Sequence, residues 1–339
     1  MRQPLGGLLD SGLHIVIGST FSLDQLERAA AAVYQAMPAT PQYAWPLLRQ
    51  AVGAEVWVKH ENHTPTGSFK VRGGLVYFAD LLQARNVPAG VISATRGNHG
   101  WSIAFAARRW GLAASIVVPH GNSTEKNAAM AALGAELIEH GHDFQAAREH
   151  AIHLARLRGL SMVPSFHPLL VQGVASYSLE LLRAVPDLDV VYVPIGLGSG
   201  ICGMIAACEA LRLATEVVGV VSDRAPAYAL SYRQQRPVDH PATTRLADGM
   251  AVRTPDADAL EVIGRRVARI VQVSDAELAE AMCLMFSATH NVAEGAGAAA
   301  LAAAYQERAR IAGRKVAVVL SGGNVDRNVF AQVLGGQWV

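Results

Sequence analysis

The stretch TPTGSFKVRGG, residues 64–74, decides the fold and the chemistry that we expect of this chain. It places Lys70 among small, turn-forming and hydroxyl residues, just before an apolar run with helical spacing. A proline and a glycine predict a turn, and Ser68 is a candidate cap for the helix that follows. Lys70 would then lie in the first helical turn, where the helix dipole and the neighbouring Arg72 favour a neutral, nucleophilic amine. The stretch therefore predicts a lysine that forms a Schiff base, with an ordinary surface lysine as the alternative.

The composition indicates a chain with a large buried core. Of 339 residues, 51% are hydrophobic and only 17% are charged, which suits parallel sheets covered by helices on both faces and a homodimer or larger homo-oligomer. The net charge of +1 gives no electrostatic case for nucleic acid or for an anionic membrane. We therefore expect a small-molecule substrate and neither of those partners.

The cysteines and the N-terminal region bear on location. Cys202, Cys208 and Cys283 fit neither a zinc site nor a disulfide framework, so we expect free thiols in a reducing compartment. No signal-peptide pattern opens the chain, and charged and polar residues interrupt the apolar stretch at 281–304. These features predict a cytoplasmic protein, in which residues 1–20 form a loosely attached extension.

Strands and helices alternate along the chain, which predicts an α/β fold with parallel sheets and right-handed crossovers. The expected strands lie at 54–59, 90–94, 114–118, 136–139, 162–163, 190–195, 217–221, 269–273 and 316–320. The expected helices lie at 22–37, 73–85, 103–110, 123–133, 144–157, 169–183, 201–213, 275–287 and 296–308. Residues 223–255 are expected to be irregular.

Ligands of such a fold bind beyond the carboxyl ends of the strands. Loops that carry glycine or asparagine follow four of the expected strands, after Lys59, Ala94, Ile195 and Leu320. We expect these loops to form the site.

The loop Gly196-Leu197-Gly198-Ser199-Gly200 has three interpretations. It could hold a monophosphate at a helix N-terminus. Its continuation to Gly203 also satisfies the dinucleotide pattern G-x-G-x-x-G, with Asp223 about twenty residues further on. The third interpretation is a structural turn. The late position of the loop favours the monophosphate, because a dinucleotide fold carries its pattern on the first strand–helix turn.

Six motifs in this order make the chain similar to the fold-type-II pyridoxal-phosphate enzymes, in the serine/threonine dehydratase (threonine ammonia-lyase) and serine racemase group. The resemblance runs from about residue 22 to 327. The motifs occupy 66–73 (TGSFKVRG), 97–100 (GNHG), 196–200 (GLGSG), 246–249 (LADG), 294–297 (EGAG) and 321–324 (SGGN). The resemblance implies two lobes of twisted, mostly parallel sheets, similar to the tryptophan synthase β subunit. A large cofactor-binding domain would comprise 1–89 and 167–339, and a small mobile domain 90–166.

The resemblance implies pyridoxal 5′-phosphate as the cofactor and gives matching residues their roles. Lys70 would bind the cofactor covalently and carry the Cα proton. Phe69 would pack on the pyridine ring, Asn98 would bond its phenolic oxygen, and Ser321 would face its nitrogen. The phosphate would lie against the glycine loop, which comprises Gly196, Leu197, Gly198, Ser199 and Gly200. Glu294 would lie near the cofactor edge.

The resemblance also implies a substrate-carboxylate loop after the second expected strand, made of Ser93, Thr95, Arg96, Gly97 and His99. Arg96 stands where racemases have an acid/base serine, and a guanidinium stays protonated, which disfavours racemisation. Arg96 could bind a second acidic group of the substrate, or pair with a carboxylate of the protein. No metal site is predicted, although Asp223 stands near the position of a metal-binding glutamate in relatives and could replace it.

These residues predict an ammonia-lyase that removes water from a β-hydroxy amino acid of the L-threonine or L-serine type and releases a 2-oxo acid and ammonia. One alternative is an amino-acid racemase on the same scaffold. Another is a dehydratase for 3-hydroxyaspartate, phenylserine or a compound derived from hydroxyectoine. A nucleotide-binding or catalytically silent protein is the alternative from a different class.

Overall fold

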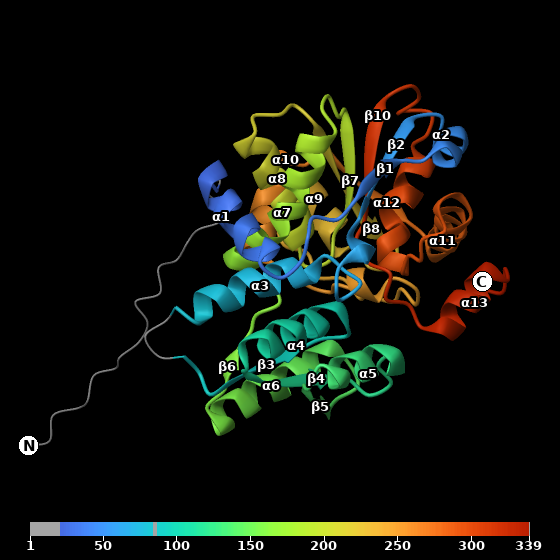
Figure 1. Ribbon diagram of the computed structural model, residues 1–339. Coiled ribbons are helices and arrows are strands. Elements are labelled where there is room, and N and C mark those ends of the chain that lie inside the picture. Colours follow the sequence, from blue (N-terminus) through green and yellow to red (C-terminus); the bar gives the residue numbers. More distant parts are fainter. Residues whose placement is uncertain (1–20, 84–86, 339) are drawn as a thin grey trace, which may run out of the picture.

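The computed structural model describes residues 21–83 and 87–338, whose helices surround two separate β-sheets (Figure 1). The extension that we expect at residues 1–20 lies outside the described residues. One sheet has six strands in the order β1-β2-β10-β7-β8-β9, and the other has four in the order β5-β4-β3-β6. All these pairings are parallel except that of β1 with β2. The predicted α/β class is confirmed.

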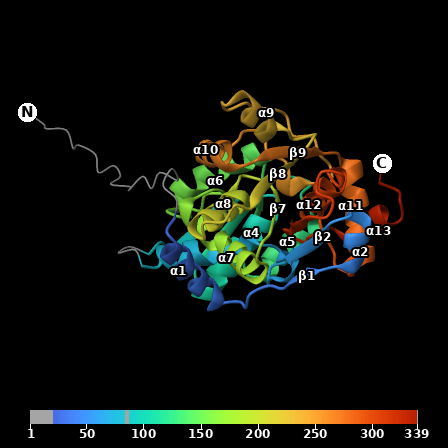
Figure 2. The same cartoon turned by 90° about the horizontal axis from the view of Figure 1, so that it is seen from above.

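The six-stranded sheet is covered on both faces. Its strands are β1 (Gln42–Ala44), β2 (Glu55–His60), β7 (Val190–Pro194), β8 (Glu216–Ser222), β9 (Arg269–Val273) and β10 (Lys315–Leu320). Along β10, Val316, Val318 and Leu320 pack in the cluster of α11 (Asp275–Thr289) and α12 (Gly295–Gln306), whereas Ala317 and Val319 pack in that of α7 (Pro168–Ala184) and α8 (Ser199–Ala210). Figure 2 shows these helix pairs on opposite sides of the sheet. Both faces of β10 are therefore buried, as its unbroken apolar run requires.

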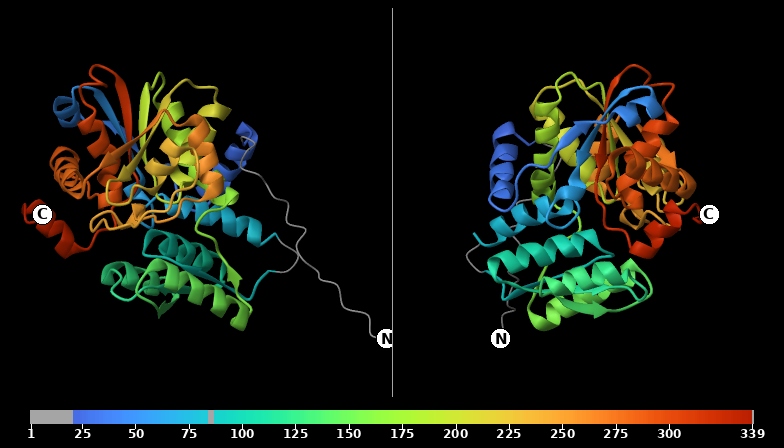
Figure 3. Two further views of the ribbon diagram at one scale, coloured as in Figure 1. Left: turned by 180° about the vertical axis from the view of Figure 1, so that it is seen from behind. Right: turned by 45° about the vertical axis from the view of Figure 1, so that its right-hand side comes forward.

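The four-stranded sheet forms its own layered unit, which lies apart from the larger sheet in both views of Figure 3. Its strands are β3 (Gly90–Ala94), β4 (Ala113–Val118), β5 (Glu136–Glu139) and β6 (Ser161–Met162). Val91 and Ile116 pack beneath α4 (Asn98–Trp110), and Ile92 and Val117 pack against α6 (Phe144–Arg158). The remaining helix is α5 (Thr124–Ala132). Figure 1 shows α3 (Lys70–Leu81) lying between the two sheets.

Several local predictions are confirmed and several are wrong. The helix expected at 22–37 is present as α1 (Leu23–Tyr34), and Ser22 and Gln25 form a capping box at its start. Ser68 does not cap α3, because Phe69 occupies the cap position. The elements that the sequence interpretation missed are β1, α2 (Pro46–Val52), α9 (Ala227–Gln234), α10 (Ala257–Arg266), α13 (Arg327–Leu334) and the 3₁₀ turns η1 (Glu61–His63) and η2 (Asp248–Met250). In α2, Pro46 occupies the first helical position, where its fixed φ suits the start of a helix.

A buried network of charges fixes α3 to its neighbours. Arg72 is fully buried and binds Glu61 and Glu180, each at 2.6 Å. Lys59, also fully buried, binds Glu180 at 2.6 Å, and Thr40 Oγ1 donates to Glu61 at 2.5 Å. Two cations and two carboxylates thus balance each other away from water, which is the condition under which buried charges are tolerated.

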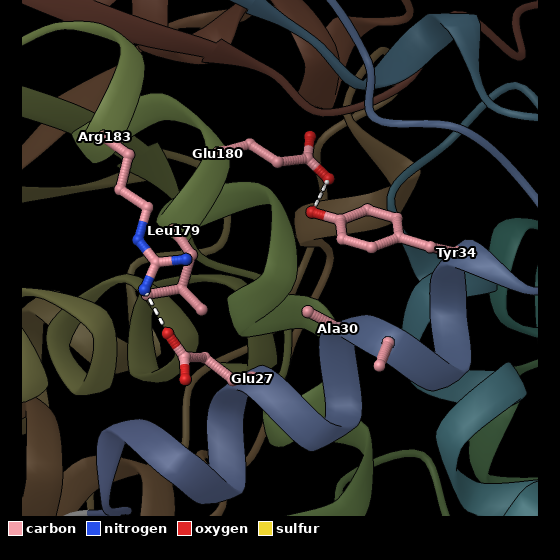
Figure 4. Close-up of a pocket in the computed structure, with 7 residues that line it drawn as sticks. Glu27, Ala30, Tyr34, Leu179, Glu180 and Arg183 are labelled. Atoms are coloured by element: carbon pink, nitrogen blue, oxygen red, sulfur yellow. Dashed lines mark hydrogen bonds and ion pairs between the residues drawn. The ribbon is translucent and has the colours of Figure 1, made fainter.

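A surface hollow between α1 and α7 lies over this network (Figure 4). Tyr34 reaches its floor and donates to Glu180 at 2.9 Å, while Glu27 and Arg183 form an exposed ion pair at its edge. The carboxylate of Glu180 therefore links the surface to the buried guanidinium of Arg72.

Replacing Arg72 by methionine should destabilise the protein strongly, because Glu61 and Glu180 would stay buried without their main cation. Losing one partner of a buried pair costs about 3–5 kcal/mol of unfolding free energy. Arg183→Met removes the same charge from an exposed pair and should cost less than about 1 kcal/mol. Urea titration of both variants measures the difference. Equal and small losses would show that the Arg72 network does not hold α3.

Candidate active site

The site begins where three parallel strands end at one edge of the six-stranded sheet. Strand β10 lies between β2 and β7, and Leu320 pairs with His60 in register. The loops that follow β2, β10 and β7 therefore leave the sheet side by side, as predicted. The loop after β3 joins them from the other sheet through Asn98, whose side chain bonds to Asn324 and Glu294.

The loops after β2 and β10 are tied together by their backbones. The N–H of Phe69 donates to the carbonyl of Ser321 at 3.1 Å, and the N–H of Gly323 donates to that of Gly67 at 2.9 Å. Gly67 has a φ of +65°, and a Cβ there would lie 2.3 Å from Asn324 Oδ1. The turn therefore needs glycine at this position both for its backbone conformation and for the close approach of Asn324.

Lys70 occupies the first position of α3 and points toward the start of α8. Its Nζ donates to Ser199 Oγ at 3.2 Å and lies 4.9 Å from the ring centre of Phe69. Burial lowers the pKa of Lys70 to about 8, while the charge of Glu294 acts in the opposite direction. The prediction that Arg72 lowers this pKa is wrong, because Arg72 is turned into its own buried network.

Lys70 differs from the other lysines of the chain. Lys59 and Lys126 are both held in ion pairs, and Lys315 donates to a backbone carbonyl at the surface. Among the ion pairs of the described residues, none includes Lys70. Its amine is therefore the one suited to act as a nucleophile.

The glycine loop presents the N-terminus of α8 to the same space. Gly198 precedes the helix with a φ of +105°, and no side chain within the described residues caps the first turn. A Cβ at Gly196 would lie 2.6 Å from the carbonyl oxygen of Gly249, and Tyr228 donates to the carbonyl of Leu197 at 2.9 Å. The loop is thus supported from behind, and its free N–H groups can bind an anion.

The third glycine of the dinucleotide pattern has a structural explanation. A Cβ at Gly203 would lie 3.0 Å from the backbone nitrogen of Ala175 and 3.3 Å from the carbonyl oxygen of Val171. Gly203 therefore permits the close packing of α8 on α7. Its presence gives no reason to prefer a dinucleotide.

The side chains of this site fit pyridoxal 5′-phosphate. The amine of Lys70 can bind an aldehyde, the start of α8 beside Ser199 can bind a phosphate, and the ring of Phe69 offers an apolar face. Ser321 is buried, and its hydroxyl donates only weakly, at 3.3 Å, to the carbonyl of Ala296. The donor set therefore matches the three parts of this cofactor.

Asn98 opens α4 and is held from two sides. Its Oδ1 accepts from Asn324 at 2.8 Å, and its Nδ2 donates to Glu294 Oε1 at 2.6 Å, which leaves one amide hydrogen for a ligand. Burial raises the pKa of Glu294 to about 7, against the opposing charge of Lys126. The sequence interpretation missed Lys126, since nothing in its local pattern distinguishes it from any lysine near a helix start.

The predicted carboxylate loop is organised mainly by its own hydrogen bonds. Thr95 Oγ1 accepts from the N–H groups of Gly97, at 3.0 Å, and Gly100, at 3.3 Å, and Ser93 Oγ donates to the carbonyl of Val163. These two hydroxyls shape the loop.

His99 and Arg96 complete this loop in different ways. Nε2 of His99 is buried without a hydrogen-bond partner in the described part of the chain, and burial beside Lys70 lowers the pKa of His99 to about 3. His99 is therefore a neutral group free to bind a ligand. Arg96 is exposed and belongs to no ion pair of the described residues, so it does not pair with a protein carboxylate there.

Asp223 lies just beyond β8, where partial burial raises its pKa and the nearby carboxylates of Asp275 and Glu277 add to this effect. Within residues 21–83 and 87–338, no group of three or more His, Cys, Asp or Glu side chains is arranged to hold a metal ion. The role of Asp223 as a metal ligand stays a prediction. In the same described ranges, no helix is long and apolar enough to cross a membrane.

The two-sheet fold and the lysine, glycine-loop and hydroxyl positions together define a pyridoxal-phosphate enzyme of fold type II. The sequence profile of the pyridoxal-phosphate dependent enzyme family matches residues 33–322. The chain therefore belongs to this family, its cofactor is pyridoxal phosphate, and the resemblance seen in the sequence is confirmed.

Several relatives share most of the fold. The chain is 34% identical over 289 residues to an L-threonine ammonia-lyase of Thermotoga maritima, a match that covers 85% of this chain and 72% of the relative. A biosynthetic L-threonine dehydratase of Haemophilus influenzae is 30% identical, with 92% and 61% covered. Among solved structures, the processed form of threonine deaminase isoform 2 from Solanum lycopersicum has a TM-score of 0.84 at 26% identity, covering 93% and 94% of the two chains. A pyridoxal 5′-phosphate-dependent aspartate racemase has a TM-score of 0.85 at 26% identity, covering 91% and 97%.

The lowered pKa of Lys70 predicts how cofactor attachment depends on pH. Only the neutral amine attacks an aldehyde, and a pKa of about 8 makes that form available well below the pH at which an ordinary lysine loses its proton. The rate of covalent attachment of pyridoxal phosphate to cofactor-free protein should rise with pH and level off above about 8. Stopped-flow absorbance measures it, with Lys70→Ala as the control. A midpoint near the ordinary lysine value of about 10.4 would contradict the buried position of this amine.

Proposed function

We propose that this protein is an ammonia-lyase that removes water from a β-hydroxy amino acid of the L-threonine or L-serine type and yields a 2-oxo acid and ammonia. The observation that carries the proposal is the contact of Lys70 Nζ with Ser199 Oγ, which brings an amine of lowered pKa to the anion-binding start of α8. The relatives named as threonine ammonia-lyase, dehydratase and deaminase support the same assignment.

The cofactor has a defined set of proposed partners. Lys70 binds it covalently, and Phe69 packs against its ring. The N–H groups of Gly196, Leu197, Gly198, Ser199 and Gly200 surround its phosphate. Asn98 uses its remaining amide hydrogen on the ring oxygen, and the hydroxyl of Ser321 faces the ring nitrogen.

Catalysis then needs one base and a fixed substrate. When bound, pyridoxal phosphate draws electrons from the substrate and makes its Cα proton acidic. The neutral amine of Lys70 accepts that proton. In the loop of Thr95, Arg96, Gly97 and His99, the backbone N–H of Arg96 and the side chain of His99 hold the substrate carboxylate. Thr95 bonds to Gly97, and Ser93 bonds to Val163, so these residues support the loop from within.

Elimination is favoured over transamination and racemisation by two side chains. Ser321 is a hydroxyl and does not force the ring nitrogen to stay protonated as a carboxylate would, which favours loss of the β-hydroxyl group. Arg96 cannot exchange a proton with Cα, because a guanidinium stays protonated. The product of losing the Cα proton and hydroxide is an unsaturated amine, which water converts to the 2-oxo acid and ammonia.

The structure also supports proposals about organisation. We take residues 90–166, which contain the whole four-stranded sheet, as a small mobile lobe, and residues 1–89 with 167–339 as the cofactor-binding lobe. The largely apolar composition is compatible with a homodimer or larger oligomer. The free Cys202 and Cys208 are buried, which supports a reducing, cytoplasmic location.

Product release from a panel of amino acids tests the proposed reaction. The panel comprises L-threonine, L-serine, 3-hydroxyaspartate, phenylserine and ring-opened hydroxyectoine derivatives. We expect equal amounts of 2-oxo acid and ammonia from one or two members, measured by coupled assays with Lys70→Ala as the control. Inverted substrate carrying solvent deuterium at Cα, without ammonia, would instead establish a racemase. No reaction with any member would contradict the lyase.

Arg96 is expected to select the substrate through its free, exposed guanidinium. If the substrate carries a second carboxylate, Arg96→Ala should lower kcat/KM for 3-hydroxyaspartate by about 10–100-fold, the loss of one or two charge-assisted hydrogen bonds. The value for L-serine should change much less. Arg108→Ala, on the outer part of α4, is the matched control. An unchanged ratio of kcat/KM between 3-hydroxyaspartate and L-serine would show that Arg96 does not bind the substrate side chain.

A further inference from the structure

The first turn of α5 is one of the places where the small lobe, residues 90–166, contacts the rest of the protein; α4 is another, through Ser102 and Asn98. Glu125 Oε1 accepts a hydrogen bond from the backbone N–H of Arg327 at 3.1 Å. Lys126 Nζ donates to Asp248 Oδ2 at 2.7 Å. Figure 1 places α13 beside the end of the small lobe that carries α5. One helical turn thus bonds to two separate segments of the other lobe.

Lys126 also reaches the loop that carries Asn98. Its side chain is only 8% exposed, and its Nζ lies 3.6 Å from Glu294 Oε2. Its methylene groups fill the space beside Gly97, where a Cβ would lie 2.6 Å from Lys126 Cδ. The ammonium of a small-lobe residue therefore lies between Asp248, Glu294 and the residue that precedes Asn98.

Glu294 is the carboxylate on which these contacts converge. Its Oε1 accepts from Asn98 at 2.6 Å, whereas its buried Oε2 has no hydrogen-bond partner in the described part of the chain. Burial and the charge of Asp248 raise the pKa of Glu294, and Lys126 lowers it. Lys70, on α3, is the other cation close enough to interact with this carboxylate. Lys126 is thus the main small-lobe group that favours the ionised form.

We propose that Lys126 is a positioning residue that links two properties of the protein. These are the contact of the small lobe with the rest of the chain, here called seating, and the charge on Glu294. Through Glu294, Lys126 also affects the orientation of the Asn98 amide. With the lobe seated, Lys126 binds Asp248 and Glu294, and the ionised carboxylate accepts from Asn98. With the lobe displaced, Glu294 loses both this cation and the hydrogen bond from Asn98, because both residues belong to that lobe. The inference rests on the proposed role of Asn98 in binding the cofactor ring.

The test follows the protonation of Glu294 in the holoenzyme by infrared spectroscopy. The carboxylic acid band that disappears in Glu294→Gln identifies this group between about pH 6 and 9, where ordinary carboxylates are ionised. In Lys126→Met the midpoint of this band should move upward by at least about one pH unit, because the carboxylate loses its nearest cation. Lys126→Arg keeps the positive charge, so its midpoint should lie close to that of the unmodified protein.

Hydrogen exchange measures the seating of the lobe in the same variants. Amides of α5 should exchange about tenfold faster in Lys126→Met than in the unmodified holoenzyme, as expected when a buried ion pair is lost. Glu125→Ala weakens the neighbouring contact with Arg327 and should therefore speed exchange. Because it leaves the ammonium of Lys126 beside Glu294, the pH midpoint of the Glu294 band should stay within about 0.3 units of the value in the unmodified protein. Lys315→Met, at the far end of β10, should change neither measurement.

Two results would overturn the inference. The midpoint of the Glu294 band could stay unchanged in Lys126→Met. Whether or not exchange becomes faster, that result would show that Lys126 has only a structural role. A shift of the same size in Lys315→Met would show a general charge effect. Neither measurement needs turnover, so a failure of the proposed lyase reaction in the substrate panel would be seen separately.

Discussion

The buried guanidinium of Arg72 is the constraint on which the active site depends. It joins α3 to Glu61, at the end of β2, and to Glu180, on α7, by contacts of 2.6 Å away from water. An ion pair in this position orders its surroundings strongly, because leaving either carboxylate without its cation is costly. Since Lys70 lies two residues before Arg72 at the start of the same helix, the network fixes the direction in which the reactive amine points. The same sequence stretch thus supplies both the proposed nucleophile and the group that holds it in place.

The second constraint is the close approach of backbones at the ends of three parallel strands. Gly67 lets Asn324 approach the turn before Lys70, and Gly196 lets Gly249 approach the glycine loop. These contacts hold the loops around the site close to one another. The helix that begins at Ser199 then offers free N–H groups beside a buried amine, which is the arrangement that an aldehyde bearing a phosphate requires.

Much of this arrangement could be predicted from the sequence, because it depends on local patterns. Apolar strands followed by glycine-bearing loops predicted which loops meet, and the six motifs predicted the cofactor. The position of Ser68 and the pKa of Lys70 were harder to predict, since they depend on contacts across the fold: Phe69 takes the cap position, and burial rather than Arg72 lowers the pKa. Lys126 could not be found from the sequence at all, because its partner Asp248 lies 122 residues away and Glu294 lies further still.

We propose that Lys70 alone carries the cofactor, and reductive trapping reports directly on the lysine that does so. Borohydride reduction of the purified holoenzyme, followed by peptide mass spectrometry, reports which lysine holds the pyridoxyl phosphate group. We predict a stable adduct on the peptide containing Lys70, with Lys59, Lys126 and Lys315 unmodified. An adduct on one of those three lysines, or no adduct on any lysine, would show that Lys70 does not carry the cofactor.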